Sequence, residues 1–120
     1  MKNTFCSLLL PLMVFILNAQ NPIVPPGVYL ADPSAHVFNG RLYVYGSLDE
    51  SPDYWCSHIH HIISSGDCIN WQIHKNVIAS KGENDQVPYN DNILYAPDCG
   101  FYKGRYYMSY CQPGREAEGI

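Results

Sequence analysis

Hydrophobic and polar residues alternate in short runs along most of the chain, and the runs are separated by turn residues. Within residues 41–47, for example, Leu42 and Val44 fall on one face of a strand while Tyr43 and Tyr45 fall on the other. A period of two is typical of β-strands that pack on at least one face. The pattern predicts strands at 35–38, 41–47, 55–65 and 71–74, with 77–79 extending or following the last one.

One segment returns in altered form 64 positions later. Residues 38–44 read FNGRLYV, and residues 102–108 read YKGRYYM. In both copies a two-residue turn ending in Gly joins segments rich in aromatic and β-branched residues, which predicts a β-hairpin with a primed turn. The recurrence indicates repeated sheets, the second unit beginning at Leu94. Acidic residues, Asp32 and Asp98, are expected just before the first strand of each unit, and we expect the chemistry there.

Three other segments are expected to lie outside the strands. Residues 21–30 carry three prolines and predict an extended lead-in that does not join the interior of a sheet. Residues 48–54 are polar, and residues 80–92 are polar and long enough to form a functional loop. One four-stranded unit and half of another leave a sheet face unpacked, whereas repeat architectures need about three units. We therefore expect a fragment of a longer protein.

The first nineteen residues have the pattern of a secretory signal peptide. Lys2 provides a positive start, an apolar run covers 5–17, and Ala19 is a small residue suited to cleavage. The run is shorter than the roughly 20 residues that span a bilayer, so a retained anchor is the less favoured alternative. We expect a signal peptide at 1–19, one domain at 20–120, and a secreted or periplasmic protein that is not held in a membrane.

Charge and composition narrow the class of partner. Seven Lys and Arg against eleven Asp and Glu give a net charge of −4, and the loss of Lys2 would make it about −5. Nucleic acids and anionic membranes require a clustered basic surface, so neither is an expected partner. Ten Tyr, two Trp and four Phe are suited to aromatic-rich strands and to a surface that stacks on sugar rings.

The cysteines leave three pairings open, because the mature chain would keep Cys56, Cys68, Cys99 and Cys111. Buried free thiols and one or two disulfides are equally compatible with the sequence. A small disulfide-stapled extracellular module is a third hypothesis for the whole chain, and it requires all four cysteines to be paired.

Histidines offer a weak metal hypothesis. His58 and His60 are expected to share a strand face, whereas His36 and His74 lie elsewhere. A zinc site needs a third ligand, and no Cys or carboxylate stands at a suitable position. We expect packed, hydrogen-bonded histidines and no metal site.

Four segments in series resemble glycoside hydrolase family 43: 29–34 (YLADPS), 38–47 (FNGRLYVYGS), 64–71 (SSGDCINW), and 95–98 with 104–107 (YAPD and GRYY). They cover almost all of the mature chain in order. The resemblance implies an all-β fold, a five-bladed β-propeller of which this chain supplies roughly the first one and a half to two blades. It also implies inverting hydrolysis of arabinose- and xylose-containing plant polysaccharides or oligosaccharides.

By this resemblance Asp32 is the general base, although an Asp before Pro is also a common turn former. An inverting glycosidase needs a carboxylate that deprotonates water and a carboxylic acid about 6.5–9.5 Å away that protonates the leaving group. In the family, that acid and a second Asp lie in later blades. Glu116 and Glu118 are therefore not assigned as the acid. We therefore expect the 120-residue chain alone to be inactive.

Tyr95 and Asp98 are the expected substrate-binding residues. The resemblance places Tyr95 in the wall of the sugar pocket, with sheet packing as the alternative. It gives Asp98 a polar role nearby, with hydrogen bonding inside the turn as the alternative. No cofactor is implied, and the ligands of the family's structural calcium would lie outside this chain. A non-catalytic carbohydrate-binding or vestigial propeller fragment is the alternative to the hydrolase.

Overall fold

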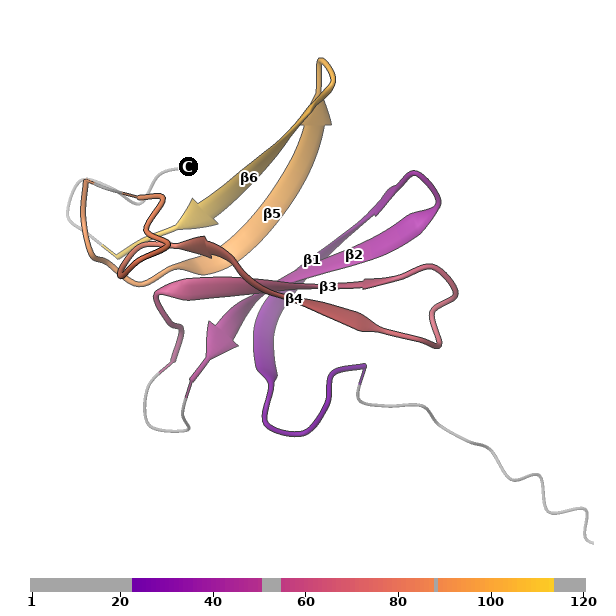
Figure 1. Ribbon diagram of the computed structural model, residues 1–120, viewed down its shortest axis with the longest axis horizontal. Coiled ribbons are helices and arrows are strands. Elements are labelled where there is room, and N and C mark those ends of the chain that lie inside the picture. The colour runs from indigo at the N-terminus through magenta and orange to yellow at the C-terminus, as the bar shows by residue number, and fades with distance from the viewer. Residues whose placement is uncertain (1–22, 51–54, 88, 114–120) are drawn as a thin grey trace, which may run out of the picture.

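The computed structural model describes residues 23–50, 55–87 and 89–113, and these residues form two antiparallel sheets (Figure 1). The first sheet has the order β1-β2-β3-β4, made of Tyr29–Phe38, Arg41–Asp49, Ile59–Ser65 and Gln72–Ala79. The second sheet pairs β5, Tyr95–Tyr102, with β6, Arg105–Cys111. One four-stranded sheet and one hairpin confirm the predicted all-β class. They also match the prediction that the chain supplies roughly one and a half to two repeated units. The predicted signal peptide lies outside the described residues.

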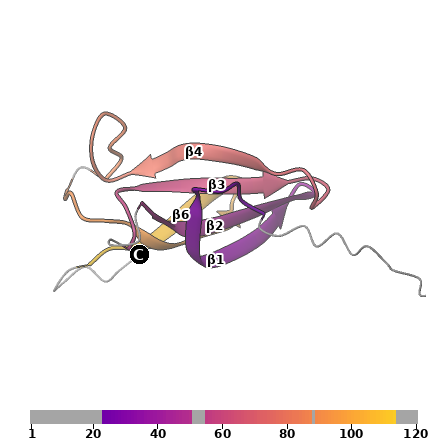
Figure 2. The same ribbon diagram turned by 90° about the horizontal axis from the view of Figure 1, so that it is seen from below.

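The strands of the first sheet follow one another across it in chain order, as the second view shows (Figure 2). β5 packs against β1 and β2, so the second sheet lies beside the inner half of the first. Tyr43 and Tyr45 point toward β5 and β6, whereas the intervening Val44 belongs to the opposite face, as the alternation predicts. No helix in the described part of the chain is long and apolar enough to cross a membrane.

The first two strands are longer than predicted. β1 begins at Tyr29 rather than at residue 35, and Tyr29 and Leu30 pair with Asp49 and Leu48. The expectations of a lead-in up to residue 30 and of a loop from residue 48 are therefore wrong at these ends. Pro33 did not end the strand because a β-bulge absorbs it, and prolines inside sheets are found at bulges and edges.

β3 is shorter than predicted, and β4 is more continuous than predicted. β3 begins at Ile59 rather than at residue 55, and β4 is one continuous strand rather than two pieces. An irregularity lies opposite His61, where Asn76 has a positive φ of 52° and donates its backbone N–H to His61 Nδ1 at 3.3 Å. His60 and His61 are both buried. The loop predicted at 80–92 is confirmed, and it ends where Leu94 bridges Ser57.

All four cysteines in the described part of the chain are free thiols. Cys56 and Cys99 are buried, Cys111 is half-buried and Cys68 is exposed. This outcome favours the buried-thiol interpretation over the disulfide-stapled module, which would need every thiol to be paired.

The repeat seen in the sequence extends to the register of the backbone. Every β5–β6 pair matches a β1–β2 pair shifted by 64 positions, from Ala31↔Ser47 and Tyr95↔Cys111 down to the turns. Both turns have two consecutive positive φ angles, 52° and 75° in the first and 48° and 78° in the second. These are the angles of a type I′ turn, so the predicted hairpins are confirmed.

Candidate functional site

Asp32 lies on a β-bulge in the middle of β1. Ala31 pairs with Ser47 and Ser34 with Tyr45, so Asp32 and Pro33 together oppose a single residue of β2. Asp32 has a φ of 47° and is exposed. Asp tolerates a positive φ better than most residues, and a bulge re-aims a side chain away from the regular ladder. Asp32 is therefore an exposed carboxylate on a bulged strand, and it does not lie in a turn before the strand.

Gly46 is the residue opposite this bulge, and a side chain would not fit there without a shift. A Cβ at Gly46 would lie 3.1 Å from Leu30 Cβ and 3.2 Å from the backbone oxygen of Ala31. The bulged segment of β1 thus packs directly on the bare backbone of β2. The Gly is part of what holds Asp32 in place.

The second unit repeats the bulge with different side chains. Tyr95 pairs with Cys111 and Asp98 with Ser109, and between them Ala96 has a φ of 45°. Ala96 is the counterpart of Asp32, 64 positions on. Asp98 instead matches Ser34, and it lies inside β5. The expectation of acidic residues just before the first strand of each unit is therefore wrong, because both lie within strands and at different points of the repeat.

Three hydrogen bonds join the two units at and beside their bulges. Ala96 donates its backbone N–H to Ser47 Oγ at 2.8 Å, and Ser34 Oγ donates to the Pro97 oxygen at 3.0 Å. His36 Nε2 lies 2.6 Å from Asp98 Oδ1. Because Ser47 also pairs with Ala31, these bonds place both bulges at the same junction. The structure thus brings the segments of Asp32, Tyr95 and Asp98 together from distant parts of the sequence.

An aromatic pair borders the junction. The Tyr95 ring is half-buried and lies 5.6 Å, centroid to centroid, from the ring of Trp55 at an angle of 55°. Trp55 is 63% exposed and therefore presents most of its ring to solvent. The sequence interpretation took Trp55 as the first residue of a strand and missed its place beside Tyr95. A solvent-exposed Trp next to a candidate sugar-binding Tyr is the signal that could have indicated it.

Electrostatics distinguish the groups near the junction. Burial is the main cause that raises the pKa of the Cys56 thiol, and the negative charges of Asp49 and Asp32 add to it. Cys56 is thus a poor nucleophile. The hydrogen bond from His36 is the main cause that lowers the pKa of Asp98, so Asp98 is ionised at neutral pH. The chemistry available here is that of carboxylates, not of a thiol.

Histidines in the described region show no grouping with other His, Cys, Asp or Glu side chains that could hold a metal ion. His74 Nε2 lies 2.7 Å from Ser64 Oγ, and His58 Nδ1 lies 3.4 Å from Ser80 Oγ. His60 is fully buried, and neither of its ring nitrogens has a hydrogen-bond partner among the described residues. Burial lowers the pKa of His60 to about 4, so its ring is neutral at physiological pH.

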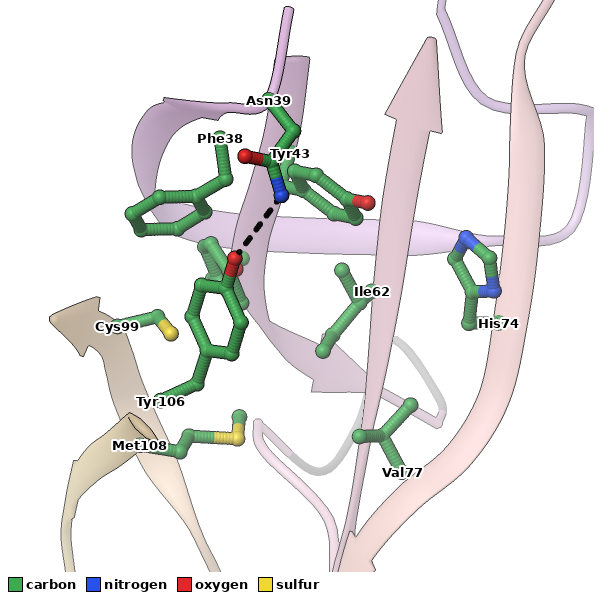
Figure 3. A pocket seen from close by; sticks show the side chains of 10 residues that line it. Phe38, Asn39, Tyr43, Ile62, His74, Val77, Cys99, Tyr106 and Met108 are labelled. Atoms are coloured by element: carbon green, nitrogen blue, oxygen red, sulfur yellow. Dashed lines mark hydrogen bonds between the residues drawn. The ribbon is translucent and has the colours of Figure 1, made fainter. Parts of the chain in front are cut away.

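A cleft of about 560 Å³ lies between the two sheets, next to this junction (Figure 3). Cys99, Tyr106 and Met108 line one side, and residues of β1 to β4 line the other. Asn39 Nδ2 donates across it to Tyr106 Oη at 3.4 Å. Its walls are mostly apolar and include none of Asp32, Tyr95 and Asp98. We interpret it as inter-sheet space that the two-stranded second sheet does not fill, and not as a sugar site.

No protein-family model matches the chain. The chain is similar to xylosidase/arabinosidase 43A of Humicola insolens, with 34% identity over 103 residues that cover 78% of this chain and 30% of the relative. A xylosidase/arabinosidase of Bacteroides ovatus is 31% identical over 102 residues, covering 78% of this chain and 31% of the relative.

A solved structure also matches, that of a GH43 β-xylosidase/α-arabinofuranosidase from a compost microbial metagenome in complex with xylotriose. The TM-score is 0.65 at 28% identity, over 80% of this chain and 30% of that chain. This chain therefore spans only about 30% of the length of its relatives. The resemblance to glycoside hydrolase family 43 found in the sequence is confirmed, since the chain matches about 30% of a GH43 structure and of two xylosidases/arabinosidases.

Proposed function

We propose that this chain contributes the general base, Asp32, to an inverting glycosidase acting on arabinose- or xylose-containing plant oligosaccharides or polysaccharides. The observation that carries the proposal is the exposed Asp32 carboxylate, held on a bulge at a junction bordered by two aromatic rings. Relatives named xylosidase/arabinosidase and a structural neighbour bound to xylotriose support the substrate class.

In the proposed reaction Asp32 accepts a proton from a water molecule while the oxygen of that water attacks the anomeric carbon. The bond from that carbon to the leaving oxygen breaks, and a carboxylic acid protonates the leaving oxygen. Asp98 is unsuited to be that acid because the hydrogen bond from His36 favours its ionised form. By the family resemblance the proton donor comes from a part of the propeller outside this chain, and we propose that the 120-residue chain is inactive by itself.

Substrate binding is assigned to Tyr95 and Asp98. The Tyr95 ring, next to the exposed Trp55, is suited to stack on a sugar face. The exposed carboxylate of Asp98 can accept hydrogen bonds from sugar hydroxyls. We further propose that the protein is exported through the signal peptide at 1–19 and acts in the periplasm or outside the cell.

The test uses the protein encoded by the complete reading frame that contains this chain. We expect it to hydrolyse xylotriose or an aryl α-L-arabinofuranoside, and Asp32→Asn to lower kcat by about 10²- to 10⁴-fold, the usual contribution of a general base. Asp91→Asn, in the exposed loop before β5, is the matched control and should leave kcat unchanged.

An Asp32→Asn variant that is folded and keeps its kcat would contradict the assignment of the base. Binding of xylotriose without hydrolysis by the wild-type protein would instead support a non-catalytic carbohydrate-binding protein.

A further inference from the structure

His36 and Asp98 form a hydrogen-bonded pair that joins the two units. His36 lies on β1, four residues after Asp32, and Asp98 lies on β5, three residues after Tyr95. The distance of 2.6 Å from His36 Nε2 to Asp98 Oδ1 is that of a strong, charge-assisted hydrogen bond. The pair therefore connects the strand of the proposed base to the strand of the proposed sugar-binding residues.

The orientation of the His36 ring is fixed by its neighbours on the first sheet. The ring stacks on Phe38 at 5.7 Å and 19°, and it meets Tyr45 at 6.3 Å and 59°. An ionised carboxylate can only accept hydrogen bonds, so Nε2 carries the proton that His36 donates to Asp98. Packing thus aims one N–H of the imidazole at one carboxylate oxygen.

The pair is specific to this place in the repeat. Sixty-four positions after His36 stands Gly100, and 64 positions before Asp98 stands Ser34. If such a pair were needed at every junction between units, the second unit would also carry a side chain able to form it at the counterpart of His36. That counterpart is Gly100, which has no side chain. General packing of one repeat on the next is therefore not a sufficient explanation.

Stability is not a sufficient explanation either. The His36 and Asp98 side chains are 39% and 54% exposed, and exposed ion pairs contribute little to folding. Both remain accessible at the junction that holds Asp32 and Tyr95. An exposed carboxylate with one oxygen held by a protein donor is an oriented acceptor for a ligand hydroxyl.

We propose that His36 is a positioning residue for the sugar site, holding the Asp98 carboxylate at the junction of the two units as an oriented acceptor for a sugar hydroxyl. This rests on the proposed function only in the identity of the ligand. The other titratable groups facing the pair are Tyr43 and Tyr45 from β2 and Cys99 from β5. The Ser34 side chain and the Cys99 backbone also hydrogen-bond Asp98, and His36 makes the largest contribution.

The first test compares three variants of the complete reading-frame protein. A Gln amide nitrogen can reach the place of Nε2, whereas the shorter Asn reaches only the place of Nδ1. With xylotriose, His36→Ala and His36→Asn should raise KM about three- to tenfold, the value of one hydrogen bond, with kcat within about twofold of wild type. His36→Gln should restore KM to within about twofold.

The second test does not depend on sugar chemistry. The ¹³Cγ signal of Asp98, assigned with Asp98→Asn, should titrate at a higher pH in His36→Ala than in wild type, and His58→Ala should leave it unchanged. If the wild-type protein does not hydrolyse xylotriose but the Asp98 titration shifts as expected, only the proposed reaction is contradicted. The Kd of xylotriose should then rise in His36→Ala and His36→Asn and be restored in His36→Gln.

Two results would overturn the positioning role. One is an Asp98 titration that His36→Ala does not move. The other is a set of KM or Kd values in which Gln, Asn and Ala at position 36 are indistinguishable.

Discussion

The β1–β2 hairpin and the β5–β6 hairpin have the same backbone and different chemistry. Each has a bulge at the same place, a Pro within the bulge, a positive φ before that Pro and a type I′ turn. Yet Asp32 corresponds to Ala96, His36 to Gly100, and Gly46 to Tyr110. A repeated unit thus provides the frame, and differences at single positions decide which copy carries the proposed base.

The same two regions differ in burial. The first sheet buries Val44, Tyr45, Leu48 and Ile63, and β5 packs against its strands β1 and β2. The second sheet leaves Phe101, Tyr102, Tyr106 and Tyr107 more than half exposed. The covered sheet supplies most of the stability of this chain, since apolar burial is the dominant favourable term in folding.

The strongest test of this difference is a core truncation in the 120-residue chain. Ile63 is fully buried, so Ile63→Ala should lower the free energy of unfolding by about 2–5 kcal/mol. Tyr107→Ser, at a side chain that is 54% exposed, should change it by less than about 0.5 kcal/mol. Urea unfolding measures both, and equal losses would show that the second sheet is as well packed as the first.

A smaller effect is expected from the glycine behind the Asp32 bulge. Gly46→Ala forces Leu30 and the Ala31 carbonyl to move and should cost about 1–3 kcal/mol. Gly100→Ala is the matched control, because a Cβ there meets no atom within 4 Å. If the two variants unfold at the same urea concentration, the close approach of β1 to Gly46 is not what holds the bulge.

The smallest effect concerns the β3–β4 turn, which has no counterpart in the β5–β6 hairpin. Asp67 Oδ1 accepts hydrogen bonds from the Ile69 and Asn70 backbone N–H groups at 2.9 and 2.7 Å. The bonds from Asn70 are the main cause that lowers the pKa of Asp67. A carboxylate whose pKa is lower in the folded state stabilises the folded protein at pH values above its unfolded pKa of about 4. This stabilisation is lost as the pH falls through the folded pKa.

Asp67→Asn should therefore lower Tm at pH 7, and the difference from wild type should shrink progressively below about pH 4. Lys103→Gln, in the β5–β6 turn, should show no such pH dependence. A Tm difference for Asp67→Asn that stays constant from pH 7 to pH 2 would contradict this account of the turn.

The hairpins could be predicted from sequence because their determinants are local. Asn39-Gly40 and Lys103-Gly104 specify the turns, and the flanking alternation specifies the faces. The bulges could not be predicted in the same way. Asp32-Pro33 has the composition of a turn, and only its pairing opposite Gly46 makes it part of a strand.

The candidate site also has a part that the sequence could predict and a part that it could not. Asp32, Tyr95 and Asp98 were identified through a family resemblance, and their assigned roles remain predictions. The contact of His36 with Asp98 joins residues 62 positions apart, so no local pattern contains it. A comparison of the two units that included Pro33 and Pro97 would have aligned Asp98 with Ser34 rather than with Asp32.

The most direct test of the central claim is the anomeric form of the sugar first released by the complete reading-frame protein, followed by ¹H NMR during hydrolysis of xylotriose. If Asp32 acts as a general base on water, the β-linked substrate should release the α-anomer first. Initial release of the β-anomer would mean retention of configuration, and it would contradict the role proposed for Asp32.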